Sequence, residues 1–336
     1  MRRTARRIVL KSRPRGLPTP DNFEIQTVEV PAIGEGEILV RNEYLGLAPS
    51  SRIRMSEIGS ETSYDQPTPI GGVIHGQSLG RVVQSRHPGY REGEQVVLNA
   101  GGWQEMSVSD GALAVHVDDT KAKATLWLGA LGVSGLTAYA GLFGVGDLRP
   151  DDTVAVSAAS GAVGAMAGQI AKVKGCRVIG IAGGADKCRY IGQELGFDAA
   201  VDYRAPDYEA ALRTACSGGV DLFFDNVGGK IRADMLGYMN NFGRIVVCGM
   251  IAEYNSLASS TGPSWLPILT RRLTVRGFLM RDHMHLHEAF VSDVSRWIGE
   301  GRITPREDIV EGFENTPAAF IRMLSGGNFG KTIVRL

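Results

Sequence analysis

Residues 154–164 read Val-Ala-Val-Ser-Ala-Ala-Ser-Gly-Ala-Val-Gly, and residues 172–187 read Lys-Val-Lys-Gly-Cys-Arg-Val-Ile-Gly-Ile-Ala-Gly-Gly-Ala-Asp-Lys. A short β-branched run enters a turn of small residues, helix-forming residues follow, and a second apolar run ends at Gly183 and Gly184. This order predicts a strand, a phosphate-binding turn, a helix and a second strand, which is the layout of a dinucleotide-binding unit.

The glycines of the turn depart from the pattern G-x-G-x-x-G. Ala159 stands where the first glycine would be, and only Gly161 and Gly164 match. We expect Gly161 to let the backbone approach a pyrophosphate, and Gly164, with Gly168 one turn on, to let the helix pack closely on the strand. The helix N-terminus would then offer free N–H groups and a positive dipole end to the phosphates. The alternative is a glycine-rich turn that binds no ligand.

The residues after the second strand favour NADP over NAD. An NAD site usually carries an acid here for the ribose 2′-hydroxyl, whereas a 2′-phosphate requires that acid to be absent and a cation to be present. The strand ends in small residues, Lys187 and Arg189 follow, and Tyr203 is placed to contact the same phosphate. Asp186 would bind a 2′-hydroxyl if the strand ended later, but we interpret it as the N-cap of a helix over residues 187–195. The predicted cofactor is therefore NADP(H).

The composition is consistent with a soluble enzyme. The 336 residues include 36 basic and 36 acidic side chains, so no net charge draws the chain to nucleic acid or to a membrane surface. No apolar run approaches the roughly 20 residues that span a bilayer. The basic N-terminus is followed by an apolar run too short for a signal peptide, and the four cysteines have no framework spacing. A cytoplasmic location is the prediction.

Two styles of sequence divide the chain into two domains. Residues 1–126 contain short alternating runs separated by Pro, Gly and Asn, which predicts a β-rich domain. Residues 127–300 alternate strand and helix patterns, which predicts a doubly wound parallel sheet of the α/β class. Residues 301–336 include an apolar run, 331–336, that we expect to return to the β-rich domain. The six strands predicted for the parallel sheet are 153–157, 176–181, 199–203, 220–225, 243–248 and 273–278. The runs predicted as strands of the β-rich domain are 23–30, 37–44, 80–85, 94–99 and 103–108.

Motifs spread over nearly the whole chain resemble those of one known family. They are Asn-Glu-Tyr-Leu (42–45), Gly-Trp-Gln-Glu (102–105), Gly-Leu-Thr-Ala-Tyr (135–139), the turn 158–164, Asp-Asn-Val-Gly-Gly (225–229), Gly-Arg-Ile (243–245), Tyr-Asn (254–255) and Asn-Phe-Gly-Lys-Thr-Ile-Val (328–334). Together they resemble the medium-chain dehydrogenase/reductase superfamily, in particular its zinc-independent NADPH-dependent double-bond reductases, the leukotriene B4 12-hydroxydehydrogenase/prostaglandin reductase group with the plant alkenal reductases. The resemblance implies a GroES-like β-rich catalytic domain and a Rossmann domain.

The sequence argues against a catalytic zinc ion. Zinc alcohol dehydrogenases share this architecture but need a Gly-His-Glu run and cysteine ligands. Residues 75–80 read His-Gly-Gln-Ser-Leu-Gly, with Gln77 in place of the glutamate, and the β-rich part has no cysteine. The other candidate ligands are His283, His285 and His287, which an extended segment would place on one face. We interpret them as a loop and the start of a helix, because no second cluster of ligands is evident, and we predict no metal.

The resemblance implies hydride transfer from NADPH to the β-carbon of an α,β-unsaturated carbonyl, followed by protonation of the enolate at the α-carbon. Negative charge would build on the carbonyl oxygen, so hydrogen-bond donors must be aimed there. The first candidate is Tyr254, since the tyrosine of this pair lies near the nicotinamide in the family. It would orient the ribose, donate to the carbonyl oxygen or help to deliver the proton. Its alternative role is packing, because a tyrosine with an ordinary pKa near 10 is a poor acid at pH 7.

The resemblance assigns the other cofactor-binding residues position by position. They are Ala159, Gly161, Ala162, Val163 and Gly164 at the pyrophosphate, Lys187 and Tyr203 at the 2′-phosphate, Asn226 at the nicotinamide-side ribose, Cys248, Gly249, Met250 and Tyr254 under the nicotinamide, Phe278, Leu279 and Met280 at the carboxamide, and Asn328 from the C-terminal tail. For Asn226 and Asn328 the alternative is a turn-forming role.

The substrate side departs from the family pattern. After Asn-x-Tyr-Leu the family usually reads Ser-Leu-Asp-Pro-Tyr-Met-Arg, whereas residues 46–52 read Gly-Leu-Ala-Pro-Ser-Ser-Arg. Ala48 and Ser50 replace the Asp and the Tyr, and such small residues should open the pocket wall. The predicted lining residues are Tyr44, Ser50, Arg52, Met55, Tyr64, Met250 and Trp265.

Three functions stay open at this point. The first is an alkenal/enone reductase. The second is a zinc-independent NADPH:quinone reductase, against which the motifs at 225–229 and 254–255 favour the first. The third is a non-catalytic NADPH-binding sensor, which the altered segment around Ser50 allows. Relatives commonly form homodimers through the edge strand of the cofactor sheet, for which residues 273–278 are the candidate.

Overall fold

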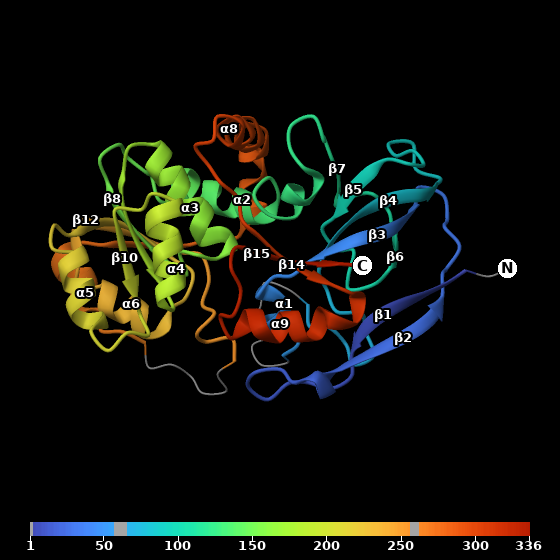
Figure 1. The fold of residues 1–336 in the computed structure, drawn as a ribbon, viewed down its shortest axis with the longest axis horizontal. Coiled ribbons are helices and arrows are strands. Elements are labelled where there is room, and N and C mark those ends of the chain that lie inside the picture. The colour runs from blue at the N-terminus through green and yellow to red at the C-terminus, as the bar shows by residue number, and fades with distance from the viewer. Residues whose placement is uncertain (1–2, 57–65, 256–261) are drawn as a thin grey trace. The chain divides into compact units, whose positions relative to one another are not determined.

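The chain folds into two units. The structure is a computed structural model that describes residues 3–56, 66–255 and 262–336 (Figure 1). Its contacts separate the chain into one unit of Met1–Leu128 with Glu307–Leu336 and another of Gly129–Arg306. The chain therefore enters the second unit after Leu128 and leaves it after Arg306.

The first unit is β-rich. Its strands are β1 (Thr4–Leu10), β2 (Phe23–Glu29), β3 (Ile38–Gly46), β4 (Gln77–Ser85), β5 (Gln95–Leu98), β6 (Met106–Ser109), β7 (Ala114–His116), β14 (Glu307–Glu311) and β15 (Lys331–Arg335). β1 and β2 form a two-stranded sheet, and the others form a seven-stranded sheet in the order β14-β15-β3-β4-β5-β7, with β6 paired to β3. β15 pairs with β3, which confirms that the C-terminal apolar run returns to the β-rich part.

Alternating apolar residues hold this sheet together. Ile38 and Val40 lie two positions apart on β3, so they point to the same face, where they pack with Val82, Val96 and Leu98. The helices of the unit are α1 (Ser50–Arg54), α9 (Thr316–Leu324) and the 3-10 turns Pro20–Asn22, Ala124–Leu128 and Phe313–Asn315. The sheet thus has a dry core on one face.

Three strands of the first unit, β1, β7 and β14, were not expected from the sequence. β1 contains the basic N-terminal segment, in which charged residues hide the apolar alternation. It is stabilised by partners far along the chain, since the Arg6 backbone N–H and side chain both donate to Glu105 at distances of 2.7 to 2.8 Å. Pairing of this kind is tertiary, and a local pattern does not reveal it.

The second unit contains the predicted parallel sheet of six strands. The strands are β8 (Thr153–Ser157), β9 (Arg177–Ala182), β10 (Ala199–Asp202), β11 (Val220–Asp225), β12 (Met239–Val247) and β13 (Thr274–Gly277). All five pairings are parallel. The helices are α2 (Val133–Tyr139), α3 (Ala162–Val173), α4 (Ala185–Arg189), α5 (Tyr208–Ala215), α6 (Gly229–Met235), α7 (Leu266–Arg271), α8 (His287–Gly299), the π-helical turns Ala140–Val145 and Tyr190–Glu194, and the 3-10 segment Met280–Leu286.

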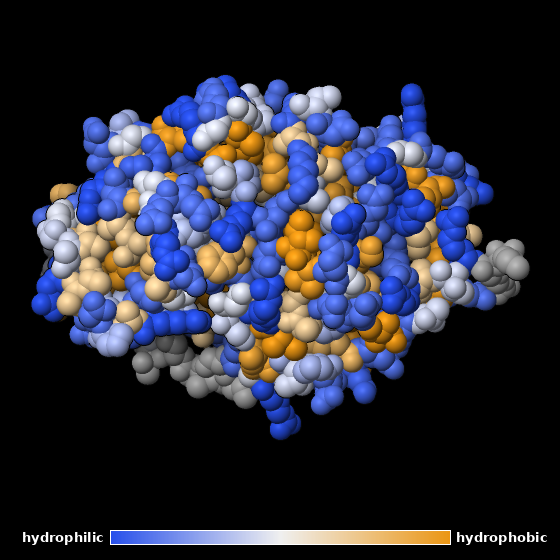
Figure 2. Space-filling view, in the orientation of Figure 1, coloured by the Kyte–Doolittle hydropathy of each residue, from blue (hydrophilic) through white to orange (hydrophobic). Residues whose placement is uncertain are grey.

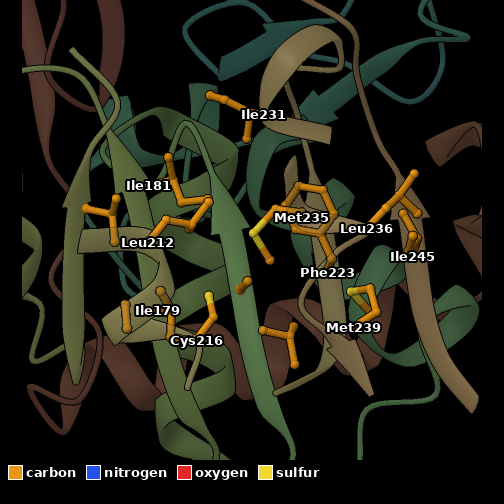
Figure 3. Close-up of a cluster of buried hydrophobic side chains, with 14 of the residues drawn as sticks. Ile179, Ile181, Leu212, Cys216, Phe223, Ile231, Met235, Leu236, Met239 and Ile245 are labelled. Atoms are coloured by element: carbon orange, nitrogen blue, oxygen red, sulfur yellow. The ribbon is translucent and has the colours of Figure 1, made fainter. Parts of the chain in front are cut away.

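The strand order of this sheet identifies where a ligand would bind. The order is β10-β9-β8-β11-β12-β13, so the chain moves outward from β8 in one direction and from β11 in the other. In doubly wound sheets ligands bind beyond the carboxyl ends of the strands at this switch point. Side chains of α5 and α6 cover one face of the sheet, with Leu212, Ile231 and Met235 packed on Phe223 and Ile245 (Figure 3). This packing fixes the helices that begin at the carboxyl edge.

The surface is mixed in polarity. Hydrophilic side chains cover much of the face in Figure 2, with hydrophobic patches between them. Within the described ranges, no helix combines the length and hydropathy that crossing a membrane requires.

Candidate functional site

The turn between β8 and α3 has the geometry of an anion-binding turn. Ala158 adopts a φ of 49°, and Gly161 is the N-cap of α3 in an extended conformation. No side chain caps the helix, so the N–H groups of its first turn are left for a ligand. A Cβ at Gly164 would overlap the Ala158 carbonyl oxygen, which means that the helix can start this close to the turn only with glycine there. These features fit a pyrophosphate.

The alanine that replaces the first glycine is accommodated from the neighbouring strand. Ala159 is fully buried, and its backbone N–H donates to the Ile181 carbonyl at 3.0 Å. Its methyl group lies 3.0 Å from the position that a Cβ of Gly180 would take. The glycine on β9 therefore makes room for the methyl group of Ala159. On α3, a Cβ at Gly168 would overlap the Phe197 ring, so this glycine packs closely against the segment after α4.

A second corner of the site lies beyond β9 and β10. The Tyr203 ring packs against the backbone of Gly183, where a Cβ would lie 2.8 Å from the ring. Lys187 is on the first turn of α4, and its N–H donates to the Gly184 carbonyl at 3.1 Å. The Asp202 carboxylate accepts the Gly184 N–H at 2.8 Å and a second backbone N–H, from Arg204, at 2.9 Å. Tyr203 and α4 therefore lie together at this corner. Asp202, the acidic residue at the end of β10, is bonded to backbone N–H groups.

The expectation that Asp186 caps the following helix is wrong. α4 begins at Ala185, and its N-cap is Gly184, with φ 100° and ψ 145°. This conformation is open to glycine and disfavoured for an L-residue, so the glycine sets where the helix starts. Asp186 lies within the first turn, and its carboxylate accepts a hydrogen bond from Arg189 at 2.9 Å. The helix continues beyond Arg189 as the π-helical turn Tyr190–Glu194.

The loops after β11 and β12 pack against each other. The Asn226 side chain donates to the Ser157 carbonyl at 2.8 Å, which ties the end of β11 to the end of β8. A Cβ at Gly249 would lie 3.1 Å from the Asn226 carbonyl oxygen, so the two loops are in close contact. In the second loop the Tyr254 hydroxyl accepts the Met250 N–H at 3.2 Å. The hydroxyl proton of Tyr254 is therefore left to be donated elsewhere.

Burial controls the ionisation of two side chains in this loop. Burial, and then the nearby Asp225, raise the pKa of the Cys248 thiol to about 12. Burial also raises the pKa of Tyr254 above its ordinary value of 10, and the Met250 N–H only partly offsets this. Both groups are protonated at neutral pH, so Tyr254 can donate a hydrogen bond there but is a weak acid.

Apart from Asn328, the predicted cofactor residues lie at one edge of the second unit. Each follows the carboxyl end of a strand, and in a parallel sheet these ends share an edge. The groups, in strand order, are Ala159 to Gly164 after β8, Lys187 after β9, Tyr203 after β10, Asn226 after β11, Cys248 to Met250 and Tyr254 after β12, and Phe278 to Met280 after β13. The predicted Trp265 lies on the same unit as the N-cap of α7 and is 77% exposed.

The remaining predicted residues belong to the first unit. Asn328 donates to the Gly330 carbonyl at 3.1 Å, a bond that shapes the turn before β15. Arg52 and Met55 are buried, and Arg52 donates to the Gly16 carbonyl at 2.9 Å. Ser50 begins α1, and Tyr44 lies on β3, where it lines a concavity of about 510 Å³ together with other residues of this unit. Tyr64 lies outside the described residues.

Sequence reasoning missed two sites of buried charge, an ion pair and a lysine. Asp225 and Arg232 form an ion pair with 2.6 Å between the Asp225 Oδ2 and the Arg232 Nε, and Asp225 is fully buried. Lys331 is buried on β15, donates to the Leu47 carbonyl at 3.0 Å, and has its pKa lowered to about 8 by burial. For the ion pair, the only signal in the sequence was an acidic residue at the end of an apolar strand. For Lys331, the only signal was a lysine at the start of an apolar strand.

In the parts of the chain that the structure describes, no three His, Cys, Asp or Glu side chains gather as a metal site. The rings of His283 and His285 lie 5.9 Å apart in the 3-10 segment before α8, and His287 is the first residue of that helix. The structure therefore has a 3-10 segment and a helix start where the sequence predicted a loop and a helix start.

Comparison with known proteins gives matches along the whole chain. A family described as an N-terminal domain of oxidoreductases matches residues 6–117, and one described as zinc-binding dehydrogenases matches residues 162–296. The chain is 43% identical to the NADPH-dependent curcumin reductase of Escherichia coli, over 98% of this chain and 96% of that one. It is 39% identical to prostaglandin reductase 1 of Rattus norvegicus, over 97% of each.

Among solved structures, the chain is similar to CurA from Vibrio vulnificus in complex with NADPH. The TM-score is 0.92, the sequence identity is 40%, and the match covers 98% of each chain. The similarity therefore extends over both units and not only over the parallel sheet.

Proposed function

Because the chain belongs to the zinc-independent, NADPH-dependent double-bond reductases of the medium-chain dehydrogenase/reductase superfamily, we propose that it reduces the carbon–carbon double bond of α,β-unsaturated aldehydes and ketones with NADPH. The observation that carries this proposal is the Tyr254 hydroxyl. It accepts the Met250 N–H at the carboxyl edge of the sheet and keeps its own proton for another acceptor. A donor in that position suits a carbonyl oxygen that gains negative charge.

Residues at the same edge would hold the cofactor. The uncapped start of α3 would bind the pyrophosphate, with Gly161 and Gly164 giving it room. Lys187 and Tyr203 would bind the 2′-phosphate. The acids near that corner are already engaged, since Asp202 accepts two backbone N–H groups and Asp186 pairs with Arg189. Acids that already have hydrogen-bond partners, with Lys187 close by, support NADP(H) over NAD(H).

The chemistry divides between the cofactor and the protein. NADPH, when bound, supplies a hydride to the β-carbon of the substrate. Tyr254 donates a hydrogen bond to the carbonyl oxygen and stabilises the enolate that forms on the substrate. Because burial raises its pKa, Tyr254 stays protonated through this step and is a poor source of the proton that the α-carbon then takes up.

Two other functions make different predictions in one set of assays. The measurement is NADPH oxidation with a trans-2-alkenal, a cyclic enone and a quinone. We expect turnover of the alkenal and the enone. Reduction of the quinone alone would replace the proposal with an NADPH:quinone reductase. Tight NADPH binding without turnover of any of the three would indicate a non-catalytic NADPH-binding sensor, the function that the small residues Ala48 and Ser50 leave open.

We further propose that the protein works in the cytoplasm as a homodimer, without nucleic-acid or membrane partners. The four cysteines are free thiols, as is usual in a reducing compartment. β13 is an edge strand with Val275 exposed, and Leu266 and Leu269 of α7 are 63% and 74% exposed. Apolar side chains beside an unpaired edge favour association with a second copy. Sedimentation should give a dimer for the native chain and a monomer for Leu269→Lys, and a native monomer would contradict the proposal.

A further inference from the structure

A buried ion pair stands at the switch point of the parallel sheet. Asp225 ends β11 and has no exposed surface, and Arg232 on α6 pairs with it at 2.6 Å, with 16% of its side chain exposed. β11 lies beside β8, whose last residue is Ser157. The Ser157 hydroxyl donates to Asp225 Oδ1 at 2.9 Å. The pair is therefore attached to the strand that leads into the phosphate-binding turn.

The Asp225 residue connects three loops of the carboxyl edge. Its Oδ1 also accepts the N–H groups of Val227 at 2.9 Å and Gly228 at 3.0 Å, which shape the loop before α6. Its backbone carbonyl accepts the N–H groups of Cys248 at 2.8 Å and Gly249 at 3.1 Å, where the loop after β12 begins. One buried residue thus holds the ends of β8, β11 and β12 in register.

The Arg232 side chain extends this network toward Tyr254. Its helix is fixed by Ile231 and Met235, which lie in the core of the sheet (Figure 3). The Arg232 Nη1 group contacts the Met250 sulfur at 3.7 Å, and the Met250 N–H donates to the Tyr254 hydroxyl at 3.2 Å. A chain of direct contacts therefore runs from Asp225 through Arg232 and Met250 to Tyr254.

Arg232 is also incompletely satisfied. Its Nη2 atom is buried and has no hydrogen-bond partner in the described part of the chain. A buried donor without a partner is destabilising. Arg244, which forms a similarly buried pair with Asp152 in the same unit, has no buried nitrogen left without a partner.

We propose that Asp225 and Arg232 are a positioning pair, which fixes the loop of residues 249–254 and so sets how the nicotinamide ring and Tyr254 face the reacting carbonyl. The inference rests on the proposed function, because that function places the nicotinamide against this loop. Neither residue needs to touch the substrate. Their effect is on orientation, so it should appear in turnover more than in the affinity for NADPH.

The test compares Arg232→Met and Arg232→Lys with the matched variants Arg244→Met and Arg244→Lys. Methionine removes the charge, and lysine keeps the charge but cannot reach Asp225 and Met250 together. Folding is checked by thermal unfolding and circular dichroism. The readouts are kcat for an enone, the dissociation constant of NADPH, and the fluorescence of bound NADPH, which reports the surroundings of the nicotinamide without turnover.

We expect both Arg232 variants to lower kcat roughly ten- to a hundredfold, with little change in NADPH affinity and an altered fluorescence of the bound nicotinamide. The folded Arg244 variants should lose stability and keep the native kcat and fluorescence. Folded Arg232 variants with native kcat and fluorescence would overturn the inference, as would equal losses in both sets. If the native protein reduces no enone, the proposed function fails, and the fluorescence comparison still decides whether Arg232 positions the nicotinamide.

Discussion

The two ends of the six-stranded sheet each contain a buried arginine–aspartate pair, and the two pairs are satisfied differently. At the amino end, Arg244 Nη2 lies 2.6 Å from Asp152, and Arg244 Nη1 donates to the carbonyl groups of Gly146 and Asp147. At the carboxyl end, Arg232 lies at the same 2.6 Å from Asp225, but its Nη2 atom has no partner among the described residues. Within the described ranges, the pair at the amino end therefore leaves no buried guanidinium nitrogen without a partner, and the pair at the carboxyl end, where the predicted cofactor residues lie, leaves one.

The largest expected effect at the carboxyl end concerns Tyr254. Replacing Tyr254 by Phe removes the donor aimed at the carbonyl oxygen and should lower kcat about 10²- to 10³-fold, equivalent to about 2.7–4 kcal/mol. The affinity for NADPH, measured by fluorescence titration, should change little. Tyr139→Phe is the control, because the Tyr139 hydroxyl donates to the Asp293 carboxylate on α8 at 3.0 Å. A Tyr254→Phe variant as active as Tyr139→Phe would remove Tyr254 from the mechanism.

Lys331, a buried cation of the first unit, allows a comparison between a buried charge that has an ion-pair partner and one that does not. Lys331 has a carbonyl partner and forms no ion pair within the described residues, and its pKa is lowered to about 8. Between that pH and the ordinary value of 10.5 the unfolded chain binds more protons than the folded one, so the free energy of unfolding should rise with pH through this group. The rise is about 3 kcal/mol from pH 7 to 11.

The measurement is urea unfolding of the native chain and of Lys331→Met over that pH range. The difference between them isolates the lysine from other groups that titrate in alkali. A difference that stays constant with pH would show that Lys331 is not desolvated in the folded protein.

The next prediction distinguishes the roles of Lys187 and Arg189, two cations near the proposed 2′-phosphate site. Lys187→Ala should raise KM for NADPH by roughly 10- to 100-fold, because one charge-assisted contact is lost, and should leave KM for NADH nearly unchanged. Arg189→Ala is the matched control, since Arg189 is exposed and paired with Asp186. Equal changes for NADPH and NADH would show that Lys187 does not bind the 2′-phosphate.

The smallest effect is expected for the replacement of one glycine at each end of the six-stranded sheet. Gly164→Ala places a methyl group against the Ala158 carbonyl and should cost about 1–3 kcal/mol of stability. Gly175 before β9 has a φ of 90° and no atom within 4 Å of a Cβ, so Gly175→Ala should cost about 1–2 kcal/mol through backbone strain alone. Isothermal titration with NADPH should show weaker binding only for Gly164→Ala. Weaker binding by both variants would mean that the two ends are not independent.

Local patterns anticipated the parallel sheet well and its charged contacts poorly. β8 and β11 have the predicted bounds, and the other four strands differ by a few residues. The N-cap of α4 was predicted at Asp186, because capping preference favours Asp, but the N-cap is Gly184, whose backbone conformation favours glycine. The strands β1, β7 and β14 were missed because their apolar alternation is interrupted by charges or is too brief to recognise.

The sequence by itself determined the alternation of strands and helices, the glycine turn after β8 and the family motifs, because each is written in neighbouring residues. The tertiary structure decided which charges are buried and what they contact. Ser157 and Asp225 are 68 positions apart, and Asp152 and Arg244 are 92 positions apart. No local pattern relates residues at such separations, since burial and pairing depend on how the strands are ordered in space. The positioning of Tyr254 through Asp225 and Arg232 is for this reason an inference that only the folded chain supports.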